Sequence, residues 1–240
     1  FMGVGYNHTC AIGDDGYLRC WGYNAHGQTD VPNDLGIAIS IAAGYNHSCA
    51  VTRDRTVRCW GAGSTNDGGT HTGQTIVPEG LTDVVSISSH WGHTCALGAD
   101  GTVVCWGDNE YEACDVPADL GFVVAISTGK RHSCAIDVDG QSVCWGQDNK
   151  TYSDVPDVYQ TKMAVSCGGT HNCVLDFDGS VQCWGSGIWG ESTPPEDLAM
   201  VSSLALGVAH SCALLIDGTV RCWGSDGEGA ISPPTDLGLV

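Results

Sequence analysis

Short apolar runs alternate with glycine-rich polar stretches along the whole chain. Residues 40–44 (Ser-Ile-Ala-Ala-Gly) are followed by His47-Ser-Cys-Ala-Val51 and then by Val57-Arg-Cys-Trp-Gly61. Apolar runs of this length, bounded by turn residues, predict short β-strands. No apolar run approaches the ~18 residues that a membrane helix requires. The pattern therefore predicts an all-β protein that does not insert into a membrane.

One motif, H-x-C-x9-C-W-G, divides the chain into six repeats. It begins at six histidines that are 39, 46, 39, 39 and 39 residues apart. These are His8, His47, His93, His132, His171 and His210. A period of about 40 residues with several strands in each repeat is typical of propeller blades. We therefore predict a single β-propeller domain, residues 1–240, with six blades; seven blades, with one lost, is the less favoured alternative.

The two ends of the chain fit together as parts of one repeat. Residues 236–240 resemble residues 34–38, and residues 1–5 resemble residues 40–44. Joining Val240 to Phe1 would continue the repeat one residue short of its 39-residue period. We therefore expect the N- and C-terminal segments to share a blade and close the ring, which removes free sheet edges.

The turn inside each motif predicts how its two strands pair. In the first repeat, a three-residue loop at residues 14–16 would place Gly16 in the left-handed conformation that this hairpin requires. Ile12 then faces Leu18, and Cys10 faces Cys20, all on one face of the sheet. Directly opposed residues lie close enough for a disulfide.

The same cysteine spacing recurs in every repeat and predicts six disulfides. The pairs are Cys10–Cys20, Cys49–Cys59, Cys95–Cys105, Cys134–Cys144, Cys173–Cys183 and Cys212–Cys222. The alternative is a zinc site in each repeat, built from residues such as His8, Cys10 and Cys20, but no repeat supplies a fourth ligand at a fixed position. Cys114 and Cys167 lie outside the pattern; they could form a seventh bridge between neighbouring blades or tether a partner.

Composition and charge narrow the classes of function. The 28 acidic and 9 basic side chains give a net charge of −19, and so acidic a surface repels phosphate backbones. We therefore expect no nucleic-acid partner. Six disulfides predict an oxidising compartment, so we expect a secreted or cell-surface protein. The chain starts at Phe1 without a charged, apolar leader, which favours a processed chain or an excised domain.

Three segments carry a family resemblance. Gly44-Tyr-Asn-His-Ser-Cys-Ala-Val51, Val57-Arg-Cys-Trp-Gly61 and Gly73-Gln-Thr-Ile-Val-Pro78 resemble the repeat of the regulator-of-chromosome-condensation superfamily, especially the short form found in β-lactamase inhibitory protein II. The resemblance covers essentially the whole chain and implies a β-propeller, usually with seven blades. Six repeats are a departure, and so is the cysteine pair, which stands where better-known relatives carry aliphatic residues.

The resemblance implies two kinds of activity. The chromatin-bound relatives promote nucleotide exchange on a small GTPase and sit on nucleosomes, which suits neither the charge of −19 nor a disulfide-bonded chain. The inhibitory relatives bind proteins through aromatic side chains in loops on one face. Because propellers host unrelated functions, these precedents have to be tested on the variable residues of this chain.

Two sets of variable residues are candidates for binding. The first lies directly before the motif histidines, where equivalent loops share one face of a propeller; it contains Tyr6, Tyr45, Trp91, Lys130 and Arg131. The second follows each Cys-Trp-Gly and contains Tyr111 and Trp189. Aromatic residues and arginine are favoured at interface hot spots. The alternatives are that the first set only covers the blade ends and that the second only packs between blades.

The strictly periodic residues predict structure rather than catalysis. One histidine and one tryptophan per motif are expected to form a repeated hydrogen bond and the packing between blades. The Asp-Gly turns lack the distal glutamate of a calcium loop, so we predict solvated turns. We expect no enzyme activity, no cofactor and no metal site.

Asn7, Asn46 and Asn149 lie in N-x-S/T sequons and are candidate glycosylation sites in a secretory route.

These features together predict a secreted or cell-surface binding module without catalysis. Its expected partner is an extracellular protein recognised through loops on one propeller face. A lectin with one shallow aromatic sugar site per blade is the alternative, and a structural subunit of an extracellular assembly, in which the chain could self-associate, is the third possibility.

Overall fold

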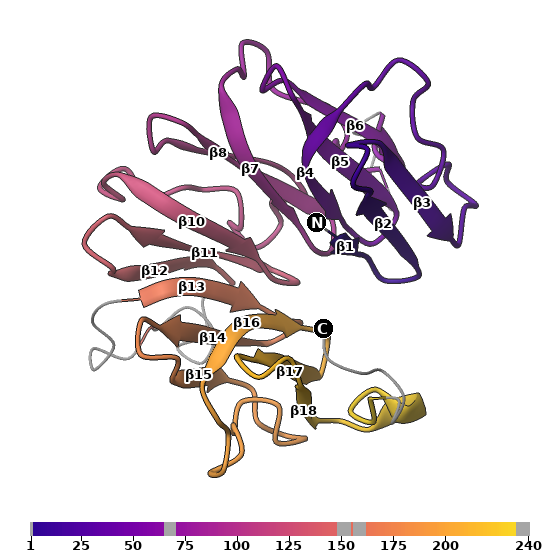
Figure 1. Cartoon of the computed structure of the whole chain (residues 1–240). Helices are drawn as coiled ribbons and strands as arrows, with labels where there is room; N and C mark the ends of the chain where they lie inside the picture. The colour runs from indigo at the N-terminus through magenta and orange to yellow at the C-terminus, as the bar shows by residue number, and fades with distance from the viewer. Residues whose placement is uncertain (1, 65–70, 148–154, 156–161, 234–240) are drawn as a thin grey trace.

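Six three-stranded antiparallel sheets form the fold of the computed structural model, which describes residues 2–64, 71–147, 155 and 162–233 (Figure 1). Each sheet comes from one repeat, and its second strand lies in the middle. The first strands are β1 (Met2–Val4), β4 (Ala38–Ala43), β7 (Val84–Ser89), β10 (Val123–Thr128), β13 (Lys162–Cys167) and β16 (Val201–Leu206). The second strands are β2 (His8–Ile12), β5 (His47–Thr52), β8 (His93–Gly98), β11 (His132–Asp137), β14 (His171–Asp176) and β17 (His210–Leu215). The third strands are β3 (Leu18–Gly22), β6 (Val57–Gly61), β9 (Val103–Gly107), β12 (Ser142–Gly146), β15 (Val181–Gly185) and β18 (Val220–Gly224), and a short 3-10 helix, η1 (Gly227–Gly229), follows.

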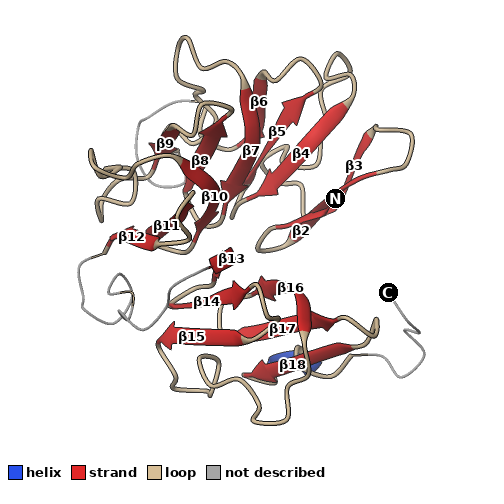
Figure 2. Ribbon diagram, turned by 60° about the vertical axis from the view of Figure 1, so that its left-hand side comes forward, coloured by secondary structure: helices blue, strands red, loops and turns tan. Residues whose placement is uncertain are grey.

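The sheets are arranged as propeller blades in chain order. Their first strands pack against one another around the centre: β1 contacts β4, β4 contacts β7, and the series continues through β10 and β13 to β16. Figures 1 and 2 both show an opening between the first sheet and the sixth. The predicted all-β propeller of six repeats is therefore confirmed. Closure of the ring by the two ends stays a prediction, because residues 1 and 234–240 lie outside the described part of the chain.

The predicted hairpin and disulfides are present. Ile12 pairs with Leu18 and Cys10 with Cys20, while Gly16 has a φ of 76°. Each repeat contains one disulfide between cysteines ten residues apart, with Cα atoms 4.0–4.1 Å apart. A zinc site on these sulfurs is therefore wrong, because a disulfide leaves no thiolate to bind the metal.

The suggested seventh bridge between Cys114 and Cys167 is absent, since both are free cysteines. Cys167 is buried at the end of the innermost strand β13, whereas Cys114 follows β9 in an outer loop, where its Sγ contacts the carbonyl of Asp108. Burial raises the pKa of each thiol to about 12, so both stay protonated at neutral pH.

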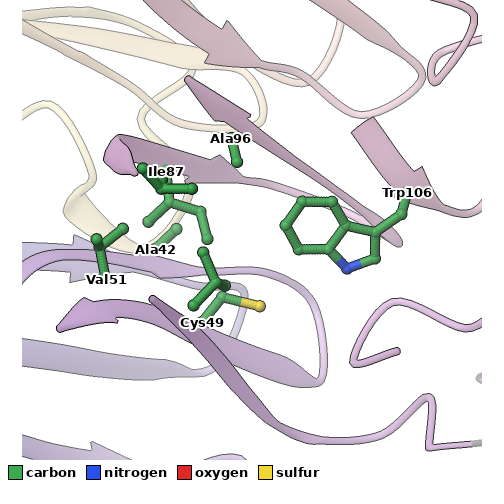
Figure 3. Close-up of a cluster of buried hydrophobic side chains, with 8 residues drawn as sticks. Ala42, Cys49, Val51, Ile87, Ala96 and Trp106 are labelled. Carbon is green, nitrogen blue, oxygen red and sulfur yellow. The ribbon is translucent and has the colours of Figure 1, made fainter. Parts of the chain in front are cut away.

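The hydrophobic core is divided among the contacts between neighbouring sheets, which we call seams. Figure 3 shows one seam, where Cys49 and Val51 of β5 lie with Ile87 of β7 and Trp106 of β9. In the five seams between consecutive sheets, the motif tryptophan of the later sheet is only 6–8% exposed. These tryptophans are Trp60, Trp106, Trp145, Trp184 and Trp223. The predicted packing between blades is confirmed for these five. Trp21 of the first sheet departs from it: it is 53% exposed, because no preceding sheet covers it in the described part of the chain.

A chain of hydrogen bonds crosses each seam. Between the first two sheets, Nε2 of His8 lies 2.9 Å from Oγ of Ser48, which donates to the carbonyl of Gln28 at 2.8 Å. The indole of Trp60 donates to the same carbonyl at 3.0 Å. The later seams repeat the histidine contact in the pairs His47–Thr94, His93–Ser133, His132–Asn172 and His171–Ser211. The repeated structural hydrogen bond expected of the motif histidines is therefore confirmed for five of them, where it joins neighbouring blades. Among the described residues, His210 makes no such bond to a next sheet.

The fifth sheet departs from the repeat in its core. Lys162 occupies the position that Ala38, Val84, Val123 and Val201 fill in other repeats, and its side chain is 1% exposed. Its Nζ lies 2.9 Å from Oδ1 of Asp176 on the neighbouring strand. A buried ion pair therefore replaces an apolar contact in this repeat.

Candidate functional site

The loops before the motif histidines gather aromatic side chains at one end of the propeller. Each loop continues the innermost strand of its sheet, so the six loops share one end of the blades. The rings of Tyr6 and Tyr45 have centroids 4.5 Å apart, and those of Tyr45 and Trp91 are 4.4 Å apart. Tyr6 also meets Trp91 edge-on at 5.8 Å. Three consecutive repeats thus contribute one ring each to a single cluster.

Two cations extend this cluster to the fourth repeat. Nζ of Lys130 lies 4.3 Å from the centroid of the Trp91 ring. Cζ of Arg131 lies 4.1 Å from the centroid of the Tyr111 ring, which comes from the loop after β9. Cations over aromatic faces are stabilised by the ring quadrupole. We call these six residues the aromatic arc: Tyr6, Tyr45, Trp91, Tyr111, Lys130 and Arg131.

Of the seven side chains that the sequence singles out for binding, the structure joins four in one cluster and two more in a neighbouring pair. The cluster is Tyr6, Tyr45, Trp91 and Lys130, and the pair is Arg131, which follows Lys130 in the chain, with Tyr111. The seventh, Trp189, lies in the loop after β15, where its backbone NH bonds Oε2 of Glu191. Trp189 is 64% exposed, and no ring contact joins it to the arc among the described residues. It is thus a separate exposed aromatic.

The cations of the arc differ from most other basic residues of the chain. Four arginines lie beside exposed aspartates, and Lys162 forms the buried pair. The arginine pairs are Arg19–Asp15, Arg55–Asp83, Arg58–Asp34 and Arg221–Asp197. Lys130 and Arg131 lie over rings instead. On a chain with a charge of −19, the arc is a local site of positive charge and aromatic surface.

His90, which the sequence analysis missed, also breaks the repeat at this end. The other five repeats have glycine at its position: Gly5, Gly44, Gly129, Gly168 and Gly207. A Cβ added at Gly44 would lie 2.2 Å from the ring of His47, so the motif histidine normally requires glycine here. A comparison of the six repeats at this one position would have found it. Burial, and then the nearby His132, His171 and Lys130, lower the pKa of His90 to about 4, so its ring is neutral at pH 7.

Two cavities adjoin the arc. The larger, of about 520 Å³, lies between the first and sixth sheets and is lined by Val4, Tyr6, His90, Trp91 and Val208, among others. The smaller, of about 210 Å³, is lined by Tyr45, Asn46, Thr72, Gln74, Trp91, Gly92 and Asp108. Cavities of the first size fall within the range of ligand sites. Trp91 therefore lines both cavities.

The candidate glycosylation and metal sites have different outcomes. Asn7 is exposed, Asn46 is only 6% exposed, and Asn149 lies outside the described residues. Burial argues against a glycan on Asn46 and leaves Asn7 as the accessible candidate.

His132, Cys134 and Cys167 come close together, but the sulfur of Cys134 is bonded to Cys144 and cannot serve as a thiolate ligand. Within the described residues, no helix is long and apolar enough to cross a membrane.

Comparisons with known proteins agree with the repeat and the fold. A family model of the Regulator of chromosome condensation (RCC1) repeat matches residues 2–28, 38–67, 84–112, 123–151, 164–187 and 201–230. A comparison with curated protein sequences found no match.

Among solved structures, Prp20p of Saccharomyces cerevisiae, described with its binding to Gsp1p and histones, has a TM-score of 0.78 at 20% identity, covering 93% of this chain and 71% of its own. The CRINKLY WD40 ectodomain of the Arabidopsis thaliana receptor kinase ACR4 has a TM-score of 0.72 at 25% identity, covering 93% and 78%. The ectodomain of the Physcomitrella patens receptor kinase CR4 has a TM-score of 0.72 at 23% identity, covering 93% and 63%. The low identities support the fold alone.

Proposed function

Because the chain belongs to the family of proteins built from regulator of chromosome condensation (RCC1) repeats, we propose that it is an extracellular binding module that recognises a protein partner through the aromatic arc. The fold itself hosts many activities, so the proposal depends on the site. The observation that carries it is the continuous contact of Tyr6, Tyr45, Trp91 and Lys130 at one propeller end. Binding, rather than catalysis, is the chemistry that this set of residues favours.

The arc has the composition and rigidity of an interface hot spot. Tyrosine, tryptophan and arginine are the residues most enriched at such spots. Tyr6 is 52% exposed, while Tyr45 and Trp91 are half-buried and held by ring contacts. Rings fixed in advance lose little conformational entropy when a partner binds. The arc can therefore offer a large apolar contact area at low entropic cost.

The disulfides support an extracellular location. Six bridges in one domain are typical of proteins that fold in an oxidising compartment. The similarity to the ACR4 ectodomain agrees with this location. The charge of −19 argues against a nucleosome partner, because the DNA backbone would be repelled.

Capture of partners from native extracellular fluid tests the proposal. Tyr45→Ala and Arg131→Ala should each weaken binding of the captured protein by roughly thirtyfold, the effect of a hot-spot loss of about 2 kcal/mol. Tyr17→Ala is the matched control, because Tyr17 is 55% exposed but lies on the hairpin turn, outside the arc. Equal binding by the wild type and all three variants would overturn the proposal.

Recognition of a glycan is the second candidate, favoured by the smaller cavity. That cavity is lined by two aromatic residues, Tyr45 and Trp91, and by polar residues that include Asp108 and Thr72. Such a set can meet both the apolar face and the hydroxyl groups of a sugar. Deglycosylation of the captured partner separates the candidates: it abolishes binding if the ligand is the glycan and leaves binding unchanged if the ligand is the protein.

A further inference from the structure

Within the described residues, the opening between the sixth and first sheets lacks the contacts that the other five seams share. In those seams, a loop of the earlier sheet covers the motif tryptophan of the later one. At the opening, Trp21 is 53% exposed, compared with 8% for Trp60. On β1 of the same sheet, Met2 is 65% and Val4 is 64% exposed. Among the described residues, the first sheet therefore has an uncovered apolar face. The equivalent faces of the other five sheets are covered in the closed seams.

The polar groups at this opening match those of the closed seams. By its place in the repeat, Thr9 corresponds to Ser48, Trp21 to Trp60, and Ala230 to Gln28. Ser48 and Trp60 both donate to the carbonyl of Gln28. In the described part of the chain, neither the Thr9 hydroxyl nor the Trp21 indole has such an acceptor. Two hydrogen-bond donors thus remain available on the first sheet.

The other side of the opening completes the site. The 520 Å³ cavity is lined by Val4 and Tyr6 from the first sheet and by Leu206, Val208 and His210 from the sixth. His210 corresponds to the histidines that bond the next sheet in every closed seam. The cavity thus has apolar walls and two imidazoles, those of His90 and His210. Val4 in its wall pairs with Thr9 on the next strand, and Thr9 pairs with Trp21, so the two donors lie in register with the cavity wall.

We propose that this open seam is a docking site for a turn-forming peptide segment of the protein partner, which supplies a backbone carbonyl to Trp21 and Thr9 and an apolar side chain to the cavity. The inference rests on the proposed function, because the cavity shares Tyr6 and Trp91 with the arc. The closed seams define what such a peptide must provide. In the first of them, the turn that contains Gln28 offers one backbone carbonyl to two donors, Ser48 and Trp60.

Residues 24–32 (Asn-Ala-His-Gly-Gln-Thr-Asp-Val-Pro) provide the template for such a segment. The amide of Asn24 donates to Oδ1 of Asp30 at 2.7 Å, and its oxygen accepts from the NH of Thr29 at 2.9 Å. The NH of Gly27 also bonds the carbonyl of Asn24 at 3.2 Å. These bonds are internal to the segment, so a short peptide retains the means to form the turn that presents the Gln28 carbonyl.

Hydroxyl-radical footprinting of the tryptophans, with and without a synthetic peptide of residues 24–32, tests the proposal. In the free protein, Trp21 should be oxidised like Trp189, which is 64% exposed, and Trp60 should be protected. Saturating peptide should protect Trp21 and leave Trp189 unchanged, whereas a scrambled peptide should protect neither. Protection of Trp21 in the free protein, to the level of Trp60, would show that the chain closes its own seam and would overturn the proposal. So would continued oxidation of Trp21 at saturating peptide.

Variants separate this proposal from the proposed function. Trp21→Phe keeps an aromatic ring but removes the indole NH, so it should weaken peptide binding about fivefold, the effect of one hydrogen bond worth about 1 kcal/mol. Trp189→Phe is the matched control and should have no effect. If Tyr45→Ala abolishes capture of the native partner while Trp21→Phe changes neither partner nor peptide binding, the arc stands and the seam proposal fails. If Trp21→Phe weakens both and Tyr45→Ala weakens neither, the seam stands and the arc fails.

Discussion

The seams and the aromatic arc use the same kinds of side chain in opposite ways. Trp106 in a seam is 7% exposed and donates to the carbonyl of Gln74 at 2.9 Å. Trp91 in the arc is half-buried and lies between Tyr45 and Lys130. His93 bonds Ser133 across a seam through its Nε2, whereas His90, only three residues away, lines the cavity beside Tyr6 and Trp91. The two regions therefore differ in how their side chains are satisfied.

This difference teaches that repetition separates structural from functional residues more reliably than residue type does. A contact needed to join blades is needed at every seam, so it recurs in each repeat. A contact made with a partner is needed once, so it breaks the repeat. Trp91, His90 and the Lys130–Arg131 pair each occur in one repeat, as the second case requires. Predictions can therefore be set as paired variants, one in each region.

The largest expected effect comes from removing one tryptophan from each region. Trp106→Ala should lower the free energy of unfolding by about 3–5 kcal/mol, because it leaves a cavity in a seam and removes the hydrogen bond from the indole to the carbonyl of Gln74. Trp91→Ala should cost about 1 kcal/mol, the worth of ring and cation contacts at a partly exposed site, and should weaken partner binding instead. Chemical denaturation followed by circular dichroism measures both. Equal losses of stability in the two variants would contradict the division into seams and arc.

Sequence alone predicts the seams well because their causes are local and repeated. The ten-residue cysteine spacing and the turn at Gly16 determine the hairpin register, and six copies make the pattern visible. The exception is Trp21, whose surroundings depend on whether the last sheet reaches the first. That question concerns the curvature of the whole arrangement, which no single repeat encodes.

The sequence predicts which residues belong to the aromatic arc but does not predict which of their side chains contact one another. Equivalent loops share one face, which places Tyr6, Tyr45 and Trp91 together, but nothing in the sequence pairs Arg131 with Tyr111 from a different loop. His90 escapes notice because it precedes a variable pair and replaces a glycine whose role becomes clear only when its distance to the motif histidine is measured. The pair Lys162–Asp176 is likewise not predicted, because the sequence does not show that Lys162, at an apolar position of the repeat, is buried beside this carboxylate.

The next effect in size is the response of the seams to acid. Burial lowers the pKa of His47 and of His93 to about 3, below the 6.5 of the unfolded chain. Between these values the unfolded state binds more protons, so the contribution of each histidine is fully present above pH 6.5 and is lost as the pH falls toward 3. The loss is at most about 1.4 kcal/mol per pH unit for each histidine.

A pair of variants assigns this acid response to the seams. Denaturation between pH 6.5 and pH 5 should show a smaller slope for His93→Gln, whose amide can still reach Ser133, than for the wild type. Trp189→Phe should leave the slope unchanged, because Trp189 is 64% exposed and lies outside both the seams and the arc. This window lies well above the pKa of Asp15, which the guanidinium of Arg19 lowers to about 2, so that carboxylate stays ionised throughout. An unchanged slope for His93→Gln would contradict the assignment of part of the acid response to this seam histidine.

The smallest expected effect on stability is that of His90→Gly, which restores the repeat at the point where it is broken. The five other repeats already carry glycine at this position, so the backbone accepts it, and the added flexibility should cost about 0.5–1 kcal/mol. The melting temperature should fall by less than about 4 °C. Partner binding should weaken, because the ring of His90 lines the same cavity as Tyr6 and Trp91. Calorimetric melting and binding to the captured partner measure the two effects, with Tyr17→Ala as the control. A fall in stability of more than about 2 kcal/mol with unchanged binding would assign His90 to the seams and show that a residue can break the repeat for purely structural reasons.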